Sequence, residues 1–424
     1  MKIKLLKHQQ DALDATAHRN RVAYYHTMGS GKTFTGSEKL VSLHRKYSSV
    51  VCQKSKVDDW VEHFQRYYPH LNVIDYTKKK ATLSPGIIVI NYDMVWRKPE
   101  LAMLSNITLL LDESSMIQNA TAKRTKFIRE ELDVGNVILL SGTPCSGKYE
   151  KLWSQCKLLG WNITKREFYD RYCIERAIEM NHVPYPIKIV VGYKNVEELK
   201  TMLRCYGAHF LNSDELFDLP EQTFTTLHIP ATPQYNRFMK DSVVEFDNVQ
   251  LIGDTALTKL LYARMLCGHY CKAKLEAFAD LLESTEERLI VFYNFKEELK
   301  ALKKIAKGRP ISEVNGSVKD LTAYEDQADS VTFCQYFSAA KGLNLQKANK
   351  MVYFSPPLSC EDWMQSKKRI HRLNQTKPCF YYILTCKDSV EEHIYSTLER
   401  GVDYTNNLFV NPHDNLQGNK QDKR

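Results

Sequence analysis

The stretch RVAYYHTMGSGKT, residues 21–33, decides the fold of this chain. Its first half is apolar and aromatic, as in a buried strand, and its second half is a glycine turn that leads into a helical pattern. A strand, a glycine-rich turn and a helix in this order direct backbone N–H groups and the positive end of a helix toward one point. The stretch therefore predicts a phosphate-binding loop at the carboxyl end of a buried strand.

The glycines of this loop let its backbone close around phosphate oxygens. Lys32 would reach the β- and γ-phosphates of a nucleotide, and Thr33 would ligate Mg²⁺. The full G-x-x-x-x-G-K-T pattern is not met because His26 occupies its first position, but the shorter Gly-x-Gly-Lys-Thr form is present. A chance glycine turn is the alternative, which the strand–turn–helix context disfavours. The predicted nucleotide-binding residues are Met28, Gly29, Ser30, Gly31, Lys32 and Thr33.

Further short apolar runs alternate with helical patterns, which is typical of buried parallel strands in an α/β sheet. They begin at Tyr47, Gly86, Ile107 and Val137, and again at Thr223, Arg288, Ser330, Lys350 and Cys379. Between the two groups, from about residue 151 to 218, helical patterns dominate and strands are hard to find. We therefore expect an α/β protein with two tandem parallel-sheet lobes and helical elaboration between them. The expected boundaries are 1–219, with the helical extension from about 151, then 220–411, then a polar tail at 412–424 that we expect to be disordered.

The composition is that of an ordinary globular chain and excludes collagen-like, low-complexity and wholly disordered classes. Among 424 residues, 43% are hydrophobic and 26% are charged. The net charge of +9 is compatible with a polyanionic partner. The 11 cysteines are odd in number and scattered, which indicates reduced thiols. Since the start has no signal-peptide pattern and no apolar run spans a bilayer, we expect a cytoplasmic protein without membrane association.

Two carboxylates, Asp112 and Glu113, follow the apolar run ITLLL. The carboxyl end of a buried strand is where α/β sheets place their active sites. Asp112 would hold Mg²⁺, directly or through water, and Glu113 would polarise the attacking water. A solvated strand end is the alternative, and the shared sheet context with Lys32 argues against it.

Three residues near the end of the chain, Gln365, Arg369 and Arg372, recur at i, i+4 and i+7. On a helix these positions share one face, which could present two guanidinium groups to a nucleotide held by the other lobe. The alternative is a solvated basic helix, since Lys367 and Lys368 intervene. We expect those two lysines to face solvent or the phosphates of a polyanionic partner.

The ordered set of motifs resembles a superfamily-two helicase, and more closely its Swi/Snf-like branch of double-stranded DNA translocases. The resemblance runs from about Leu6 to Leu398. In the first half, LKHQ from Leu6 resembles the glutamine motif, and the other segments resemble motifs I, Ia, Ib, II and III: MGSGKT, VVCQKSKVDDWVEHF, VINYD, DESSMIQN and SGTP. In the second half, three segments resemble motifs IV, V and VI: RLIVFYNFKEELKAL, FSAAKGLNLQKAN and QSKKRIHRLNQ.

The resemblance implies two RecA-like lobes that form one ATPase cleft, with ATP and Mg²⁺ as ligands and Gln9 in contact with adenine. It makes Lys32, Asp112, Glu113, Gln365, Arg369 and Arg372 the expected catalytic residues. It also implies sequence-independent, salt-sensitive contacts with DNA phosphates. The residues expected to make contacts with DNA are Lys54, Ser55, Asn91, Tyr92, Asn294 and Ser338. A compact motor of this size resembles bacterial or phage types, which would act in the cytoplasm of a bacterial cell or infected host.

Three functions remain open at this point. An ATP-driven translocase or helicase is the first, acting on double-stranded or branched DNA; the short segment between motifs V and VI favours duplex translocation, because it has little room for a strand-separating hairpin. An ATP-switched clamp on DNA is the second. It would suit motif V, where Ala340 and Lys341 replace the usual Gly and Glu. An RNA-directed motor is the third.

The pair Cys267 and Cys271 invites a zinc hypothesis. A structural zinc site needs four ligands, usually in two pairs, and no second Cys or His pair lies at suitable spacing. We therefore expect these thiols to be packed as small apolar side chains.

Overall fold

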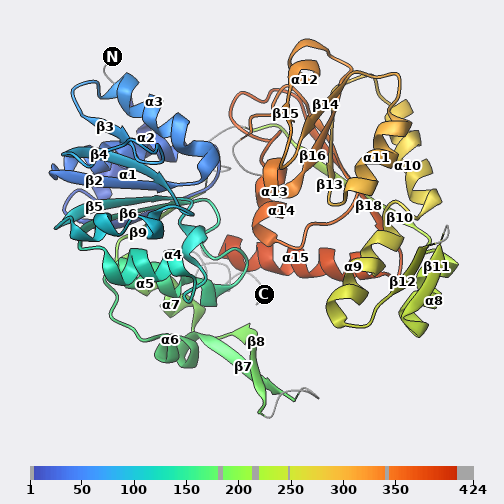
Figure 1. The fold of residues 1–424 in the computed structure, drawn as a ribbon, viewed down its shortest axis with the longest axis horizontal. Coiled ribbons are helices and arrows are strands. Elements are labelled where there is room, and N and C mark those ends of the chain that lie inside the picture. Colours follow the sequence, from blue (N-terminus) through green and yellow to red (C-terminus); the bar gives the residue numbers. More distant parts are fainter. Residues whose placement is uncertain (1–3, 180–184, 213–218, 247–248, 340–342, 408–424) are drawn as a thin grey trace, which may run out of the picture. The chain divides into compact units, whose positions relative to one another are not determined.

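The computed structural model describes residues 4–179, 185–212, 219–246, 249–339 and 343–407. The chain forms two compact units: Met1–Leu216 together with Val402–Arg424, and Phe217–Gly401. Each unit is built around its own sheet (Figure 1). The residues predicted as a polar tail, 412–424, lie outside the described part of the chain.

The sheet of the first unit is parallel throughout. Its seven strands, in spatial order, are β3 (Val73–Asp75), β4 (Gly86–Asn91), β2 (Tyr47–Cys52), β5 (Ile107–Asp112), β6 (Val134–Ser141), β1 (Arg21–His26) and β9 (Ala208–Leu211). The helices of this unit are α1 (Lys7–Ala15), α2 (Lys32–Ser42), α3 (Val57–Tyr67), α4 (Lys123–Lys126), α5 (Trp153–Leu158), α6 (Lys165–Tyr172) and α7 (Val196–Cys205).

Both faces of this sheet are covered, which explains why its strands read as continuous apolar runs. Tyr24 packs in the cluster that holds α1, α2 and α3, whereas its neighbour Tyr25 packs in the cluster that holds α5, α6 and α7. Val50 and Val51 divide between the same two clusters, and all four side chains are fully buried. Because side chains alternate along each strand, every strand contributes to the apolar core on both faces of the sheet.

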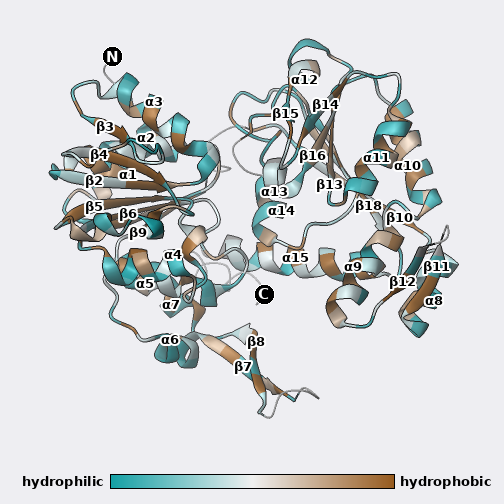
Figure 2. Ribbon diagram, in the orientation of Figure 1, coloured by the Kyte–Doolittle hydropathy of each residue, from teal (hydrophilic) through white to brown (hydrophobic). Residues whose placement is uncertain are grey.

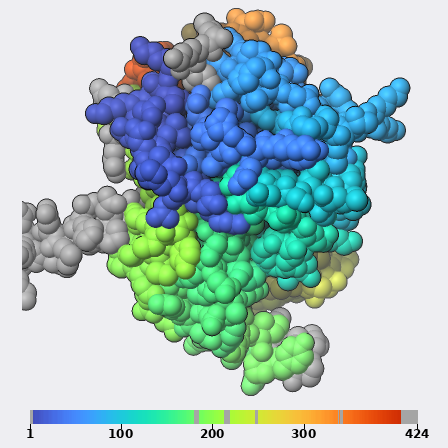
Figure 3. Space-filling view, turned by 90° about the vertical axis from the view of Figure 1, so that its left-hand side faces the viewer, coloured from blue at the N-terminus to red at the C-terminus, as the bar shows by residue number. Residues whose placement is uncertain are grey.

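The region from 151 to 218 differs from its purely helical prediction. It contains α5, α6 and α7, but also an antiparallel hairpin of β7 (Cys173–Ile178) and β8 (Ile187–Tyr193), and β9, which pairs with β1. The hairpin forms a sheet of its own and projects from the first unit (Figures 1 and 3). Figure 2 shows that much of it is apolar. Ile174, Ile178 and Ile189 are between 39% and 46% exposed.

The sheet of the second unit is also mainly parallel. Its seven strands, in spatial order, are β10 (Gln222–Ile229), β18 (Cys379–Cys386), β17 (Lys350–Tyr353), β13 (Leu289–Tyr293), β16 (Val331–Gln335), β14 (Ile311–Val314) and the antiparallel edge β15 (Lys319–Asp320). The helices are α8 (Pro233–Asp241), α9 (Ala256–Cys267), α10 (Lys272–Glu283), α11 (Lys296–Ile305), α12 (Thr322–Asp326), α13 (Tyr336–Ala339), α14 (Cys360–Lys367) and α15 (Val390–Asn407). A small hairpin, β11 (Val243–Phe246) with β12 (Val249–Ile252), lies beside α8 and α9.

These two sheets confirm the predicted α/β class with two parallel-sheet lobes. The end of α15, from Val402, belongs to the first unit. There the hydroxyl of Thr405 is fully buried and accepts a hydrogen bond from the backbone N–H of Gly147 at 3.1 Å. No helix within the described ranges combines the length and the apolar character that crossing a bilayer requires.

Candidate functional site

The loop between β1 and α2 has the backbone that its glycines predict. Gly29 and Gly31 have φ angles of 86° and 74°, in the left-handed region that favours glycine. Gly31 is also the N-cap of α2. A Cβ atom on Gly31 would lie 2.3 Å from Nε2 of Gln9, so that a side chain at this position would displace the amide of Gln9. The positive φ is therefore the main reason for glycine here.

The polar side chains around this loop are tied to its backbone. Lys32 Nζ donates hydrogen bonds to the carbonyl oxygens of His26 and Thr27, at 2.9 and 3.3 Å. Gln9 Nε2 donates to the carbonyl of Gly31 at 3.2 Å, and Gln9 Oε1 accepts from the backbone N–H of Leu6 at 2.9 Å. Gln9 thus fastens the start of α1 to the loop. These contacts support the grouping of Gln9 with Lys32, while contact of Gln9 with adenine stays a prediction.

The acidic pair lies at the same edge of the sheet as this loop. β6 pairs in parallel with both β5 and β1, so the carboxyl ends of the three strands coincide. In the register of the sheet, Asp112 on β5 and Tyr24 on β1 face the same residue of β6, Leu140. The structure therefore brings Asp112 and Glu113 together with the phosphate loop, as the sequence predicts.

The surroundings of Asp112 fit a carboxylate that holds a cation. Trp60 Nε1 donates a hydrogen bond to Asp112 Oδ2 at 2.9 Å and fixes the side chain. Burial raises the pKa of Asp112, and the Trp60 hydrogen bond and the charge of Lys32 oppose this effect. A buried carboxylate is stabilised by a nearby positive charge, and Mg²⁺ prefers oxygen ligands of this kind. Asp112 and the hydroxyl of Thr33, the residue after Lys32, are suited to that ion.

Glu113 has a strained backbone, with φ at 54°, where the chain leaves β5. Strain of this kind persists where surrounding contacts fix it, often at functional sites. Here Tyr92 supplies such contacts, because its hydroxyl donates to the carbonyls of Asp112 and Glu113 at 3.0 and 3.4 Å. Ser141, at the end of β6, donates to Glu113 Oε2 at 3.5 Å. Tyr92, which follows β4, thus holds the main chain at Glu113, and Ser141, at the end of β6, holds its carboxylate.

The predicted DNA-binding residues of the first unit divide into two classes. Lys54 and Ser55 are exposed in the short helix that follows β2 and are available to a polyanion. Asn91 is 4% exposed and its Oδ1 accepts a hydrogen bond from the backbone N–H of Met94. Tyr92 is 1% exposed and supports the acidic pair. Asn91 and Tyr92 thus make internal contacts, which the sequence could not show because burial depends on what packs over a strand end. Their contact with DNA stays a prediction.

The second unit corrects the prediction of one helix face for Gln365, Arg369 and Arg372. α14 ends at Lys367, so that both arginines lie beyond it. They converge nevertheless, because Arg369 Nη1 and Arg372 Nη1 donate to the carbonyl of Leu343 at 2.8 and 3.3 Å. Arg369 Nε also donates to the carbonyl of Gln365 at 3.2 Å. Burial lowers the pKa of Arg372 from its usual value.

A side chain ties the segment after α14 to a neighbouring loop. Gln375 Nε2 lies within hydrogen-bond distance of the carbonyls of Gln346, Ala348 and Ile370, at 3.1, 3.0 and 3.1 Å. One amide thereby fastens the segment to the loop before β17.

In the second unit, Asn294 makes internal contacts, whereas Ser338 and Lys367 are half-buried. Asn294 Nδ2 donates to Ser355 Oγ and to the carbonyl of Pro356, at 2.8 and 2.9 Å. Ser338 is half-buried in α13. Lys367 lies over the ring of Trp363, with 4.6 Å between Nζ and the ring centroid. Ala340 and Lys341, which depart from the expected motif V, lie outside the described residues.

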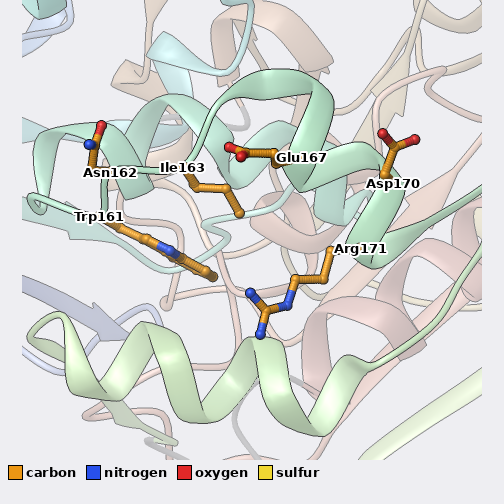
Figure 4. Close-up of a pocket in the computed structure, with 6 residues that line it drawn as sticks. All are labelled: Trp161, Asn162, Ile163, Glu167, Asp170 and Arg171. Carbon is orange, nitrogen blue, oxygen red and sulfur yellow. The ribbon is translucent and has the colours of Figure 1, made fainter.

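A surface pocket in the first unit is formed by other residues. Its volume is about 460 Å³ (Figure 4), and it is lined by Trp161, Asn162, Ile163, Glu167, Asp170 and Arg171. Its charged groups already have partners: Asp170 pairs with Arg166 at 2.6 Å, and Arg171 pairs with Glu198. The pocket contains none of the predicted motif residues, so we do not assign it to the site.

Comparisons with known proteins agree with this geometry. A family model described as "SNF2-related domain" matches residues 13–274, and one described as "Helicase conserved C-terminal domain" matches residues 273–374. A SWI/SNF-related matrix-associated actin-dependent regulator of chromatin subfamily A-like protein 1 from Drosophila melanogaster is 22% identical over 93% of this chain and 55% of its own length. TATA-binding protein-associated factor MOT1 of Saccharomyces cerevisiae is 26% identical over 63% of this chain and 17% of its own length.

Among solved structures, the Sulfolobus solfataricus SWI2/SNF2 ATPase core in complex with dsDNA covers 97% of this chain and 94% of its own, at 18% identity and a TM-score of 0.45. The chain spans about half the length of several curated relatives that it matches.

Proposed function

Because the chain belongs to the SNF2-related family, we propose that it is an ATPase that couples hydrolysis to movement along duplex DNA or to its remodelling. One observation carries this proposal: Lys32, Asp112 and Glu113 meet at one edge of a parallel sheet, where the family model matches. Both lobes are of the RecA-like kind that such motors use. The helicase C-terminal model over residues 273–374 supports a second lobe with a role in the same reaction.

In this proposal each residue of the first unit has one task. Lys32 binds the β- and γ-phosphates of ATP, and the loop backbone from Met28 to Gly31 surrounds them. Thr33 and Asp112 hold Mg²⁺, which neutralises charge on the phosphates. Glu113, fixed by Ser141, orients the water that attacks the γ-phosphate.

The second unit is proposed to supply positive charge. Arg369 and Arg372 point to one carbonyl oxygen, that of Leu343, so their guanidinium groups are close together. Two such groups can stabilise the charge that develops as the phosphate bond breaks. Gln365 is 1% exposed and bonds to Glu361, which gives it a positioning role for this segment.

Duplex or branched DNA is the proposed partner. The excess of basic residues, a net +9, and the exposed Lys54 and Ser55 favour sequence-independent contacts with phosphates. We further propose a compact bacterial or phage-type motor that acts in the cytoplasm; the relatives named above come from an insect and a yeast. An ATP-switched clamp without movement is the second candidate, favoured by the substitutions Ala340 and Lys341 in motif V.

One experiment separates these candidates. ATP turnover of the full chain is measured with duplex DNA, single-stranded DNA and RNA of equal length, and displacement of a triplex-forming third strand is followed on the same duplex. A translocase shows stimulation by duplex DNA together with ATP-dependent displacement. Stimulation without displacement establishes the clamp, and stimulation by RNA alone overturns the DNA assignment.

A further inference from the structure

Three cysteines and a buried ion pair meet where four elements of the second unit come together (Figure 1). Cys267 is the last residue of α9, Cys271 is the N-cap of α10, and Cys386 ends β18. Glu391 lies in the first turn of α15. All four side chains are at most 1% exposed.

The sequence could not assemble this group because its members are distant along the chain. Cys267 and Cys271 form the first half of a metal-binding pattern, and the missing half is absent nearby. The fold supplies a further ligand. β18 ends beside the turn between α9 and α10, which places Cys386 next to Cys271 although 115 residues separate them in the sequence. Glu391 then follows at the start of the next helix.

The distances between the candidate ligand atoms suit a tetrahedral ion. The sulfur atoms of Cys271 and Cys386 are 3.9 Å apart. The sulfur atoms of Cys267 and Cys386 and a carboxylate oxygen of Glu391 all lie within 4.8 Å of one another. With zinc–sulfur bonds of about 2.3 Å, two thiolates of a tetrahedral site are about 3.8 Å apart. Cys271 lies beside Cys386 but outside the group of three that Cys267, Cys386 and Glu391 form, so its sulfur has to move toward the other three ligands when an ion binds.

The charges around the cluster also suit a divalent cation. Lys274 is fully buried, and its Nζ lies 2.7 Å from both carboxylate oxygens of Glu391. Each carboxylate oxygen has two lone pairs. Oε2 accepts from Lys274 and from the backbone N–H of Cys386 at 3.0 Å, so Oε1 is the oxygen that keeps a lone pair for a metal ion. Three thiolates and one carboxylate outweigh the charge of a divalent ion, and the ammonium of Lys274 offsets part of this excess.

We propose that Cys267, Cys271, Cys386 and Glu391 form a structural binding site for Zn²⁺. Thiolates and a tetrahedral arrangement select zinc over the harder Mg²⁺ of the ATPase site. Each thiol that binds loses its proton to solvent, and the ion takes the place of the hydrogen bond between Cys386 and the carbonyl of Cys267. The ion joins α9, α10, β18 and α15, so it stabilises the second unit. This role is separate from ATP hydrolysis.

The full chain is expressed with added zinc, purified with a phosphine reductant and no chelator, and its metal content is measured by mass spectrometry. The expected result is about one zinc per chain for the wild type. Cys386→Ser should lower the zinc content by about tenfold or more. Cys379→Ser is the matched control, because Cys379 is a fully buried cysteine at the other end of the same strand, and it should retain the zinc.

Cobalt provides a second measurement that needs no variant. The zinc-free wild type, titrated with Co²⁺, should develop the sulfur-to-cobalt charge-transfer band and the visible bands of a tetrahedral ion. Folding of each variant is checked by circular dichroism, and Cys267→Ser replaces Cys386→Ser if the latter does not fold.

Three results would overturn the proposal. The first is a folded wild type without zinc and without the cobalt bands. The second is a folded Cys386→Ser variant that keeps its zinc. The third is a zinc-free wild type, handled without reductant, in which alkylation and mass spectrometry find Cys271 and Cys386 joined by a disulfide and which then takes up no Co²⁺ after reduction.

Discussion

At the scale of single residues, the site depends on a few atoms that the backbone places. The ammonium of Lys32 is already held by two carbonyl oxygens of its own loop, and Asp112 is fixed by the indole N–H of Trp60. Both side chains are therefore already ordered beside the loop before a nucleotide binds. Substitutions at these residues should therefore change chemistry far more than folding.

We expect Lys32→Ala to abolish ATP turnover in a folded protein. The loop loses the charge that binds the β- and γ-phosphates, and removal of one such electrostatic contact typically costs about 10²-fold or more in rate. The measurement is DNA-stimulated ATP hydrolysis, with circular dichroism to verify folding. Turnover above about a tenth of the wild-type rate would contradict the assignment. Lys79→Ala, on an exposed loop of the same unit, serves as the charge-matched control.

Glu113→Gln should bind ATP but hydrolyse it slowly. The amide keeps the size of the side chain and loses the carboxylate that orients water, while Asp112 stays available for Mg²⁺. Nucleotide retention after gel filtration and single-turnover hydrolysis test this expectation. If the variant hydrolyses ATP at the wild-type rate, another group activates the water. Glu130→Gln, an exposed change in the same unit, controls for the loss of a negative charge.

At the scale of elements, the accuracy of prediction followed the burial of each strand. Runs such as ITLLL are almost continuously apolar because helices cover both faces of the sheet, and this makes them recognisable without a structure. β9 has only four residues and counts as a strand because it pairs with β1, which its composition does not reveal. β7 and β8 were missed for the opposite reason, since apolar side chains on a projecting hairpin do not follow the pattern of a core.

Some features of the candidate site could be predicted from the sequence and others could not. The phosphate loop and the acidic pair were predictable because local sequence fixes them: glycines set the turn and a buried strand delivers the carboxylates. The path of the segment after α14 was not predictable, because Gln375 bonds to carbonyls up to 29 residues away in the sequence. Burial of Tyr92 was likewise hidden, because its hydroxyl bonds to the backbone at the end of β5, two strands away in the sheet.

The segment after α14 provides a test at this scale. Arg372→Ala should leave ATP binding nearly intact and collapse DNA-stimulated hydrolysis, since an arginine of this kind contributes about 10³-fold or more to turnover. Lys368→Ala, four residues earlier, should have a modest effect on DNA affinity or none. Turnover at saturating ATP and DNA is the measurement. If Arg372→Ala matches the wild type there and Lys368→Ala is inactive, the arginines do not act on the nucleotide.

At the scale of the whole molecule, charge governs association with nucleic acid. The net charge of +9 and a backbone-reading mode predict that affinity falls steeply with salt and varies little with sequence. For Z neutralised phosphates, log K should fall with log[salt] at a slope of about −0.9Z on duplex DNA. Fluorescence anisotropy with several duplexes of equal length measures both properties. A flat salt response, or strong preference for one sequence, would instead indicate a protein that reads base edges.

Acid should destabilise the first unit through its buried histidines. Burial lowers the pKa of His63 to about 4, and burial also lowers the pKa of His26 and of His209, with which His26 shares a hydrogen bond. The unfolded chain binds protons below pH about 6.5, whereas the folded unit does not, so the free energy of unfolding falls as pH drops below that value. The expected slope is about 1.4 kcal/mol per pH unit for each such histidine.

Thermal or urea unfolding between pH 8 and 4.5 measures this effect. His63→Gln should reduce the pH dependence of the free energy of unfolding by about 1.4 kcal/mol per pH unit, the contribution of one proton. The glutamine amide can keep a hydrogen bond to Ser37 without titrating. An unchanged slope in this variant would show that His63 is not a source of the acid sensitivity.

Finally, the order in which the ribosome makes this chain differs from the order in which its parts are completed. The first unit includes the end of α15, from Val402 to Asn407, where Thr405 satisfies a backbone N–H of the loop that follows β6. A nascent chain that stops before residue 402 therefore carries all strands of the first sheet but leaves Gly147 without this partner. The ribosome must synthesise the whole second unit before residue 402. The first unit therefore begins to emerge first but is completed after the second.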